Sequence, residues 1–145
     1  MEKLKSYILA TLLLFVGILS FAQQAEKTLV KTFNLHGNNV VRLDMNGPVE
    51  VRTWKNPTMR VQMTISSENG SNALLKSLVQ SGRYNLRSTQ GEEGLVINAP
   101  AFKREVKLGK TLIQENLSFV IYAPENTSVR WSNEASTDYS TDDAL

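Results

Sequence analysis

The sequence contains no cysteine and a single histidine, His36. Without cysteine the chain can form no disulfide, no thiolate zinc site and no lipid-modified N-terminal cysteine. One histidine alone builds neither a histidine-rich metal site nor a Ser-His-Asp triad. His36 precedes Gly37, Asn38 and Asn39, residue types that favour turns. We therefore interpret His36 as a turn residue and expect no catalytic residue, no metal and no cofactor.

A large excess of charge of either sign is also missing. The chain contains sixteen Lys and Arg and fourteen Asp and Glu, which gives a net charge of +2. This near-balance provides no electrostatic case for nucleic-acid binding. One basic cluster is present, formed by Lys103, Arg104, Lys107 and Lys110, with Phe102 as its one aromatic residue. We interpret it as a lysine-rich strand edge that discourages edge-to-edge aggregation.

A long apolar run occurs at the start of the chain. The charged residues of Met1–Lys5 precede an apolar stretch from Tyr7 to Leu19, and Ser20-Phe21-Ala22 follows with small residues at its first and third positions. This order is typical of a secretory signal peptide, and we predict cleavage after Ala22 to leave Gln23 at the N-terminus. An uncleaved anchor is the alternative, because no charged residue occurs between Lys5 and Glu26 and a spanning helix needs about 20 predominantly apolar residues. We expect an exported protein of the periplasm, cell surface or medium, which contacts the membrane only through the signal segment before cleavage.

The remaining chain has the length of one domain. We place a β-rich domain at residues 23–131 and an acidic, Ser/Thr-rich tail without Lys or Arg at 132–145. Asp138, Asp142 and Asp143 in that tail lack the glycine-centred loop of calcium motifs, so we interpret them as a plain acidic segment.

Alternation of apolar and polar residues with a period of two dominates the domain and predicts strands with one buried face. One segment instead has helical spacing, with capping residues before it and Gly82 after it, which predicts a helix over Asn72–Ser81. In the first strand, Lys31 falls among the apolar positions. The expected strands cover residues 28–35, 41–45, 49–54, 59–65, 84–87, 95–99, 117–123 and 129–131, with a short strand at Val106 and Leu108.

Two short motifs within this order resemble a known family. Gly47-Pro48-Val49-Glu50-Val51-Arg52-Thr53-Trp54 is similar to the Gly-x-Val-x-Val-x-x-Trp segment, and Ile121-Tyr122-Ala123-Pro124 to the Ile-Tyr-x-Pro strand, of bacterial putative-adhesin domains related to the auto-transporter adhesin head domain. The resemblance implies a β-solenoid of stacked strands, with a β-sandwich as the alternative. Because the family's Gly-rich rungs do not follow Trp131, it also implies either a short member or a truncated one.

Two sets of side chains are candidates for a function. Trp54, Tyr122 and Trp131, together with Tyr84, are candidates for an aromatic surface that binds a ligand or partner. Glu50, Glu92 and Glu93 are the carboxylates to consider for glycoside hydrolysis. We interpret them as solvated surface residues, since Glu50 alternates with valines on an outer face and the other two lie in a turn.

The sequence therefore predicts a mainly β, non-enzymatic module of the envelope or cell surface with an adhesion-like role. A glycan-binding or small carbohydrate-active module is the alternative, and a truncated family member is another. The expected partners are an envelope polysaccharide or another envelope protein.

Overall fold

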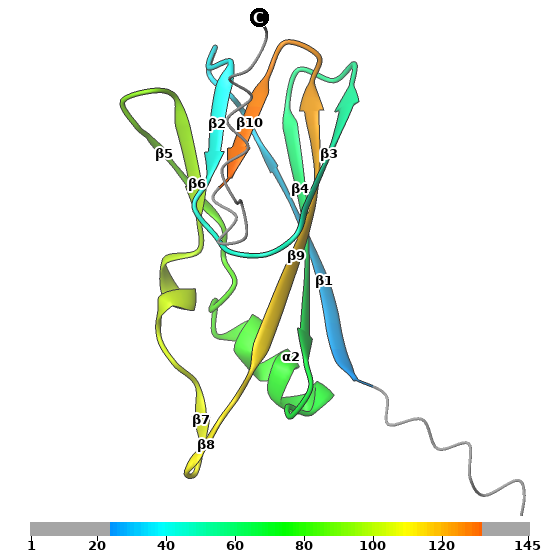
Figure 1. The fold of residues 1–145 in the computed structure, drawn as a ribbon, viewed down its shortest axis with the longest axis vertical. Helices are drawn as coiled ribbons and strands as arrows, with labels where there is room; N and C mark the ends of the chain where they lie inside the picture. Colours follow the sequence, from blue (N-terminus) through cyan, green and yellow to red (C-terminus); the bar gives the residue numbers. More distant parts are fainter. Residues whose placement is uncertain (1–23, 132–145) are drawn as a thin grey trace, which may run out of the picture.

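Two four-stranded β-sheets, a two-stranded hairpin and one α-helix make up residues 24–131, the part of the chain that the computed structural model describes (Figure 1). The expected signal peptide at residues 1–22 and the acidic tail at 132–145 lie outside the described residues. Within residues 24–131, no helix is both long and apolar enough to cross a membrane.

The first sheet, sheet A, has the strand order β1-β4-β9-β3. Strand β4 pairs antiparallel with both β1 and β9, whereas β3 runs parallel to β9 at the edge of the sheet. The strands are β1 (Ala25–Phe33), β4 (Met59–Ser67), β9 (Glu115–Pro124) and β3 (Val49–Trp54).

The second sheet, sheet B, has the order β10-β2-β6-β5. Strands β10, β2 and β6 are parallel, and β5 pairs antiparallel with β6. The strands are β10 (Ser128–Trp131), β2 (Val40–Leu43), β6 (Leu95–Asn98) and β5 (Arg87–Gln90).

The core lies where the inner faces of the two sheets meet. In β4 every second side chain is buried, and the same alternation runs through β9 and through the central strands of sheet B, as the period of two predicts. One continuous apolar cluster includes residues of both sheets, among them Met59, Val61, Met63, Ile65, Phe119, Ile121, Val41, Leu43 and Ile97. The prediction of a mainly β fold is confirmed.

The expected solenoid is not confirmed. A solenoid adds its rungs in chain order, but β10 lies on the opposite side of β2 from β6, so the last strand is not the outermost rung after β6. Strands β1, β4 and β5 are moreover antiparallel to their neighbours. Among the described residues the arrangement is compatible with the β-sandwich alternative, in which two sheets share one core.

The predicted helix is confirmed as α2 (Asn72–Gln80). Its N-terminus is capped by Ser71, whose hydroxyl accepts a hydrogen bond from the amide of Leu74 at 3.1 Å. After its last turn the chain reverses at Gly82, which has φ +79°. Leu75 is buried, and the helix packs against β1.

Lys31 has a specific reason to occupy an inward position of β1. Its ammonium donates a hydrogen bond to the carbonyl of Leu86 at 2.6 Å and lies 5.5 Å from the ring centroid of Phe33. The stem of the side chain therefore covers apolar surface while its charge keeps polar partners.

The segment after the helix differs from the prediction in two ways. Tyr84 and Leu86 are buried, so Tyr84 is no part of an aromatic surface, and both precede the strand, because β5 begins at Arg87. The basic cluster does not lie on an edge of sheet A or B. It begins at the last residue of a 3₁₀ turn, η1 (Pro100–Lys103), and continues into a separate hairpin of β7 (Lys107–Leu108) and β8 (Thr111–Leu112).

Candidate ligand-binding face

The solvent side of sheet A carries a row of polar and aromatic side chains across three strands. Arg60 of β4 lies opposite Tyr122 of β9, which in turn lies opposite Arg52 of β3. Because strand residues alternate between faces, all three project away from the core. Both arginines are exposed and Tyr122 is half-buried.

Trp54 joins this row at the end of β3. Its ring centroid lies 5.6 Å from that of Tyr122 with a tilt of 41° between the planes, within the range of favourable aromatic pairs. The indole N–H donates a hydrogen bond to the carbonyl of Thr58 at 2.8 Å, which fixes the ring. Trp54, one of the candidates for the aromatic surface, is half-buried and lies on the outer side of sheet A, in phase with Arg52.

The two arginines are held differently. Arg60 places its guanidinium carbon 4.9 Å from the Trp54 ring centroid, a cation–π contact, and makes no ion pair within residues 24–131. Arg52 donates hydrogen bonds to the Tyr122 hydroxyl at 3.1 Å and to Glu50 at 2.7 Å. The hydrogen bond and the charge of Arg52 hold the pKa of the Glu50 carboxyl below its ordinary value. Glu50 is therefore an ionised partner of Arg52.

We call Glu50, Arg52, Trp54, Arg60 and Tyr122 the Trp54 face. It offers apolar ring surface, a hydroxyl and the fixed donors of Arg60 side by side. Such a set suits recognition of a ligand with apolar faces and anionic groups, since guanidinium binds carboxylate through two parallel hydrogen bonds.

The other candidate residues lie elsewhere. Trp131, on β10 of sheet B, is in register with the buried Leu43, so it lies on the inner side of sheet B with 37% of its surface exposed. The structure therefore brings Trp54 and Tyr122 together and leaves Trp131 apart. Glu93 is ion-paired to Arg130 of sheet B at 2.8 Å, whereas Glu50 lies on β3 of sheet A, so the carboxylates considered for glycoside hydrolysis do not gather at one site.

Two further expectations concern the turn histidine and metals. His36 lies in the turn after β1 with φ 48°, followed by Gly37 with φ +82°, which confirms the turn. In the portion of the chain that the structure describes, no three carboxylate or histidine side chains are grouped to hold a metal.

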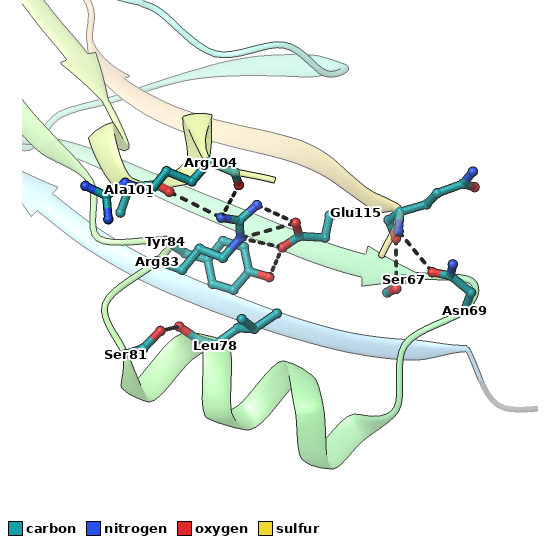
Figure 2. A network of polar contacts seen from close by, with 10 residues as sticks. Ser67, Asn69, Leu78, Ser81, Arg83, Tyr84, Ala101, Arg104 and Glu115 are labelled. Carbon is teal, nitrogen blue, oxygen red and sulfur yellow. Dashed lines mark hydrogen bonds and ion pairs between the residues drawn. The ribbon is translucent and has the colours of Figure 1, made fainter. Parts of the chain in front are cut away.

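A buried polar network, which the sequence did not predict, lies near the start of β9 (Figure 2). Arg83 and Glu115 form an ion pair at 2.6 Å, with side chains 8% and 4% exposed. The Tyr84 hydroxyl donates to Glu115, and Arg83 also donates to the carbonyls of Arg104 at 2.6 Å and Ala101 at 3.2 Å. The network thus joins β9 to the segment after α2 and to the segment around η1.

The protonation states of this network suit a structural role, in which the side chains hold three segments together. Burial raises the pKa of Tyr84, and the hydrogen bond and charge of Glu115 raise it further. Burial alone would lower the pKa of Arg83, but Glu115 and Tyr84 together raise it. Since both groups keep their protons and Glu115 is covered by its partners, the cluster lacks the accessible carboxyl that acid–base catalysis requires.

Comparison with known proteins gives one distant likeness. No protein-family model and no curated protein matches the chain. Among solved structures, the crystal structure of a putative adhesin from Bacteroides fragilis is similar with a TM-score of 0.39 and 9% identity over 74% of this chain. The chain spans 40% of the length of that protein. A likeness this distant establishes no family, and the link to the auto-transporter adhesin head domain has no counterpart in it.

Proposed function

We propose that this chain is an exported, non-enzymatic module of the cell envelope or cell surface, which works in adhesion by binding an acidic polysaccharide through the Trp54 face. The observation that carries the proposal is the stacking of Arg60 on Trp54 beside Tyr122, with no ion-pair partner for Arg60 within residues 24–131. Export is supported by the order of charged, apolar and small residues at the start of the sequence.

The chemistry and the extended shape of this face suit a polysaccharide. A sugar ring presents an apolar face, which packs on an aromatic side chain, and uronic acids add a carboxylate that a guanidinium binds at two points. The row formed by Arg60, Tyr122 and Arg52 crosses three paired strands, so it can follow an extended chain.

We expect Arg60→Gln to weaken binding to a uronic-acid polysaccharide by roughly 10- to 100-fold, the range of a lost charged hydrogen bond. Binding of the purified protein to an array of acidic and neutral glycans, followed by titration calorimetry, measures the loss. Arg42→Gln is the matched control, because Arg42 is an exposed arginine on the outer side of sheet B. Its binding is expected to stay within about twofold of the unmodified protein.

Two results would overturn this assignment. Equal losses for Arg60→Gln and Arg42→Gln would indicate a general charge effect and no site. Release of reducing ends from the bound glycan by the unmodified protein would replace binding by hydrolysis. Thermal unfolding of each variant identifies any loss that comes from instability.

Location is tested separately by protease treatment of intact producing cells, with mass spectrometry of the N-terminus. We expect Gln23 as the first residue and loss of the protein to external protease. Protection from protease together with Gln23 would assign the module to the periplasm, and a retained Met1 would indicate the membrane anchor.

A further inference from the structure

The β7–β8 hairpin lies at the same end of the molecule as α2 (Figure 1), and it exposes two leucines. Leu108 is 64% exposed and Leu112 is 43% exposed. The strands are joined by Gly109 and Lys110, with Gly109 at φ +65°, as tight hairpin turns require. A narrow hairpin has no core of its own, so both leucines stay exposed and are available to a partner.

Basic residues surround these leucines. Lys103, Arg104, Lys107 and Lys110 are all exposed, and Glu105 is the one acidic residue between positions 103 and 112. This gives the segment a net charge of about +3. A partner that is both apolar and anionic would therefore complement the hairpin.

The base of the hairpin is fixed by side chains from two other segments, shown in part in Figure 2. On the first arm, Arg83 donates a hydrogen bond to the carbonyl of Arg104. On the second arm, Asn69 donates to the carbonyl of Leu112 at 2.8 Å and accepts from the amide of Gln114 at 2.9 Å. Because both arms are tied down, the hairpin is presented in one orientation.

We propose that this hairpin docks on a membrane surface rich in anionic phospholipid, with Leu108 and Leu112 in the interfacial region and the basic residues against the headgroups. Cross-strand partners share a face, so Leu108 with Thr111 and Leu112 with Lys107 lie on opposite faces. A protein surface would cover one of these faces, whereas a fluid headgroup region surrounds both. The combination of apolar and basic residues is typical of interfacial membrane binding. This inference is independent of the Trp54 face.

The first test is flotation of the purified protein, with Gln23 verified as its N-terminus, on phosphatidylglycerol–phosphatidylcholine vesicles and on pure phosphatidylcholine. We expect binding to the anionic vesicles only, weakening as salt is raised. Lys107→Gln with Lys110→Gln is expected to reduce binding by roughly tenfold or more. The charge-matched control, Lys55→Gln with Lys76→Gln, removes exposed lysines elsewhere and is expected to retain it.

The second test uses the absence of cysteine. Leu108→Cys offers a single site for an environment-sensitive dye, whose emission is expected to shift to the blue with anionic vesicles. The same dye on Ser88→Cys, on the exposed strand β5, is expected to show no shift. The proposal is overturned by equal binding to neutral vesicles, by equal losses in both lysine pairs, or by binding to polyglutamate without binding to vesicles.

Discussion

Replacing Glu115 by glutamine is expected to lower the free energy of unfolding by about 3–5 kcal/mol, the cost of removing one partner of a buried ion pair. Glutamine keeps the size of the side chain, so packing is preserved. Arg83 then stays 8% exposed without its carboxylate, and the Tyr84 hydroxyl loses a charged acceptor. For a domain of this size the melting temperature should fall by roughly 15–25 °C, which circular dichroism measures directly.

The control for this prediction is the same substitution in an exposed ion pair. Glu93 pairs with Arg130 at 2.8 Å, but its side chain is 79% exposed, so Glu93→Gln is expected to cost less than about 1 kcal/mol. A double-mutant cycle of Arg83→Met and Glu115→Leu isolates the coupling, and the second replacement should cost less than the first. Similar melting temperatures for Glu115→Gln and Glu93→Gln would contradict a buried, charged pair.

The second large effect is expected at Gly94, which precedes β6. This residue has φ +149°, a conformation that side chains rarely adopt, and a Cβ here would overlap the carbonyl oxygen of Val40 on the neighbouring strand β2. Gly94→Ala is therefore expected to cost about 3 kcal/mol or more, or to prevent folding. Denaturant unfolding and the yield of soluble protein measure the effect.

Gly37 provides the matched comparison. Its φ is also positive, at +82°, but nothing lies within 4 Å of an added Cβ. Gly37→Ala should cost only about 1–2 kcal/mol, the backbone penalty alone. Equal losses of stability in the two alanine variants would contradict the close approach of Gly94 to β2.

Local elements could be predicted well from the sequence because their signals are local. The helical spacing with Ser71 and Gly82 identified α2, and alternation identified most of the strands. In β3, however, alternation predicted a buried face, whereas Val51 is 38% exposed. The reason is that β3 lies at the edge of sheet A, and a strand's position in its sheet does not show in its own pattern.

The pairing of strands and the polar network could not be predicted for the same reason. Alternation shows which face of a strand is buried but does not show which strand pairs with it. The parallel pairs β3·β9 and β2·β10 could therefore not be predicted. Arg83 and Glu115 are 32 positions apart in the sequence, and neither has a local signature. Of the candidate surface, the phase of Trp54 was readable, but its contact with Tyr122 depends on the pairing of β3 with β9.

Those parallel pairs also determine when the domain can fold. Arg52 of β3 and Tyr122 of β9 meet although they are 70 positions apart, and β2 gains its neighbour β10 only from the last described residues. Contacts between such distant parts of the chain form slowly, because a long loop must close before they stabilise anything. A chain emerging from the ribosome thus lacks one strand of each sheet until β9 and β10 have been made. For the export proposed above, such a delay would keep the nascent chain unfolded while it is still competent for translocation.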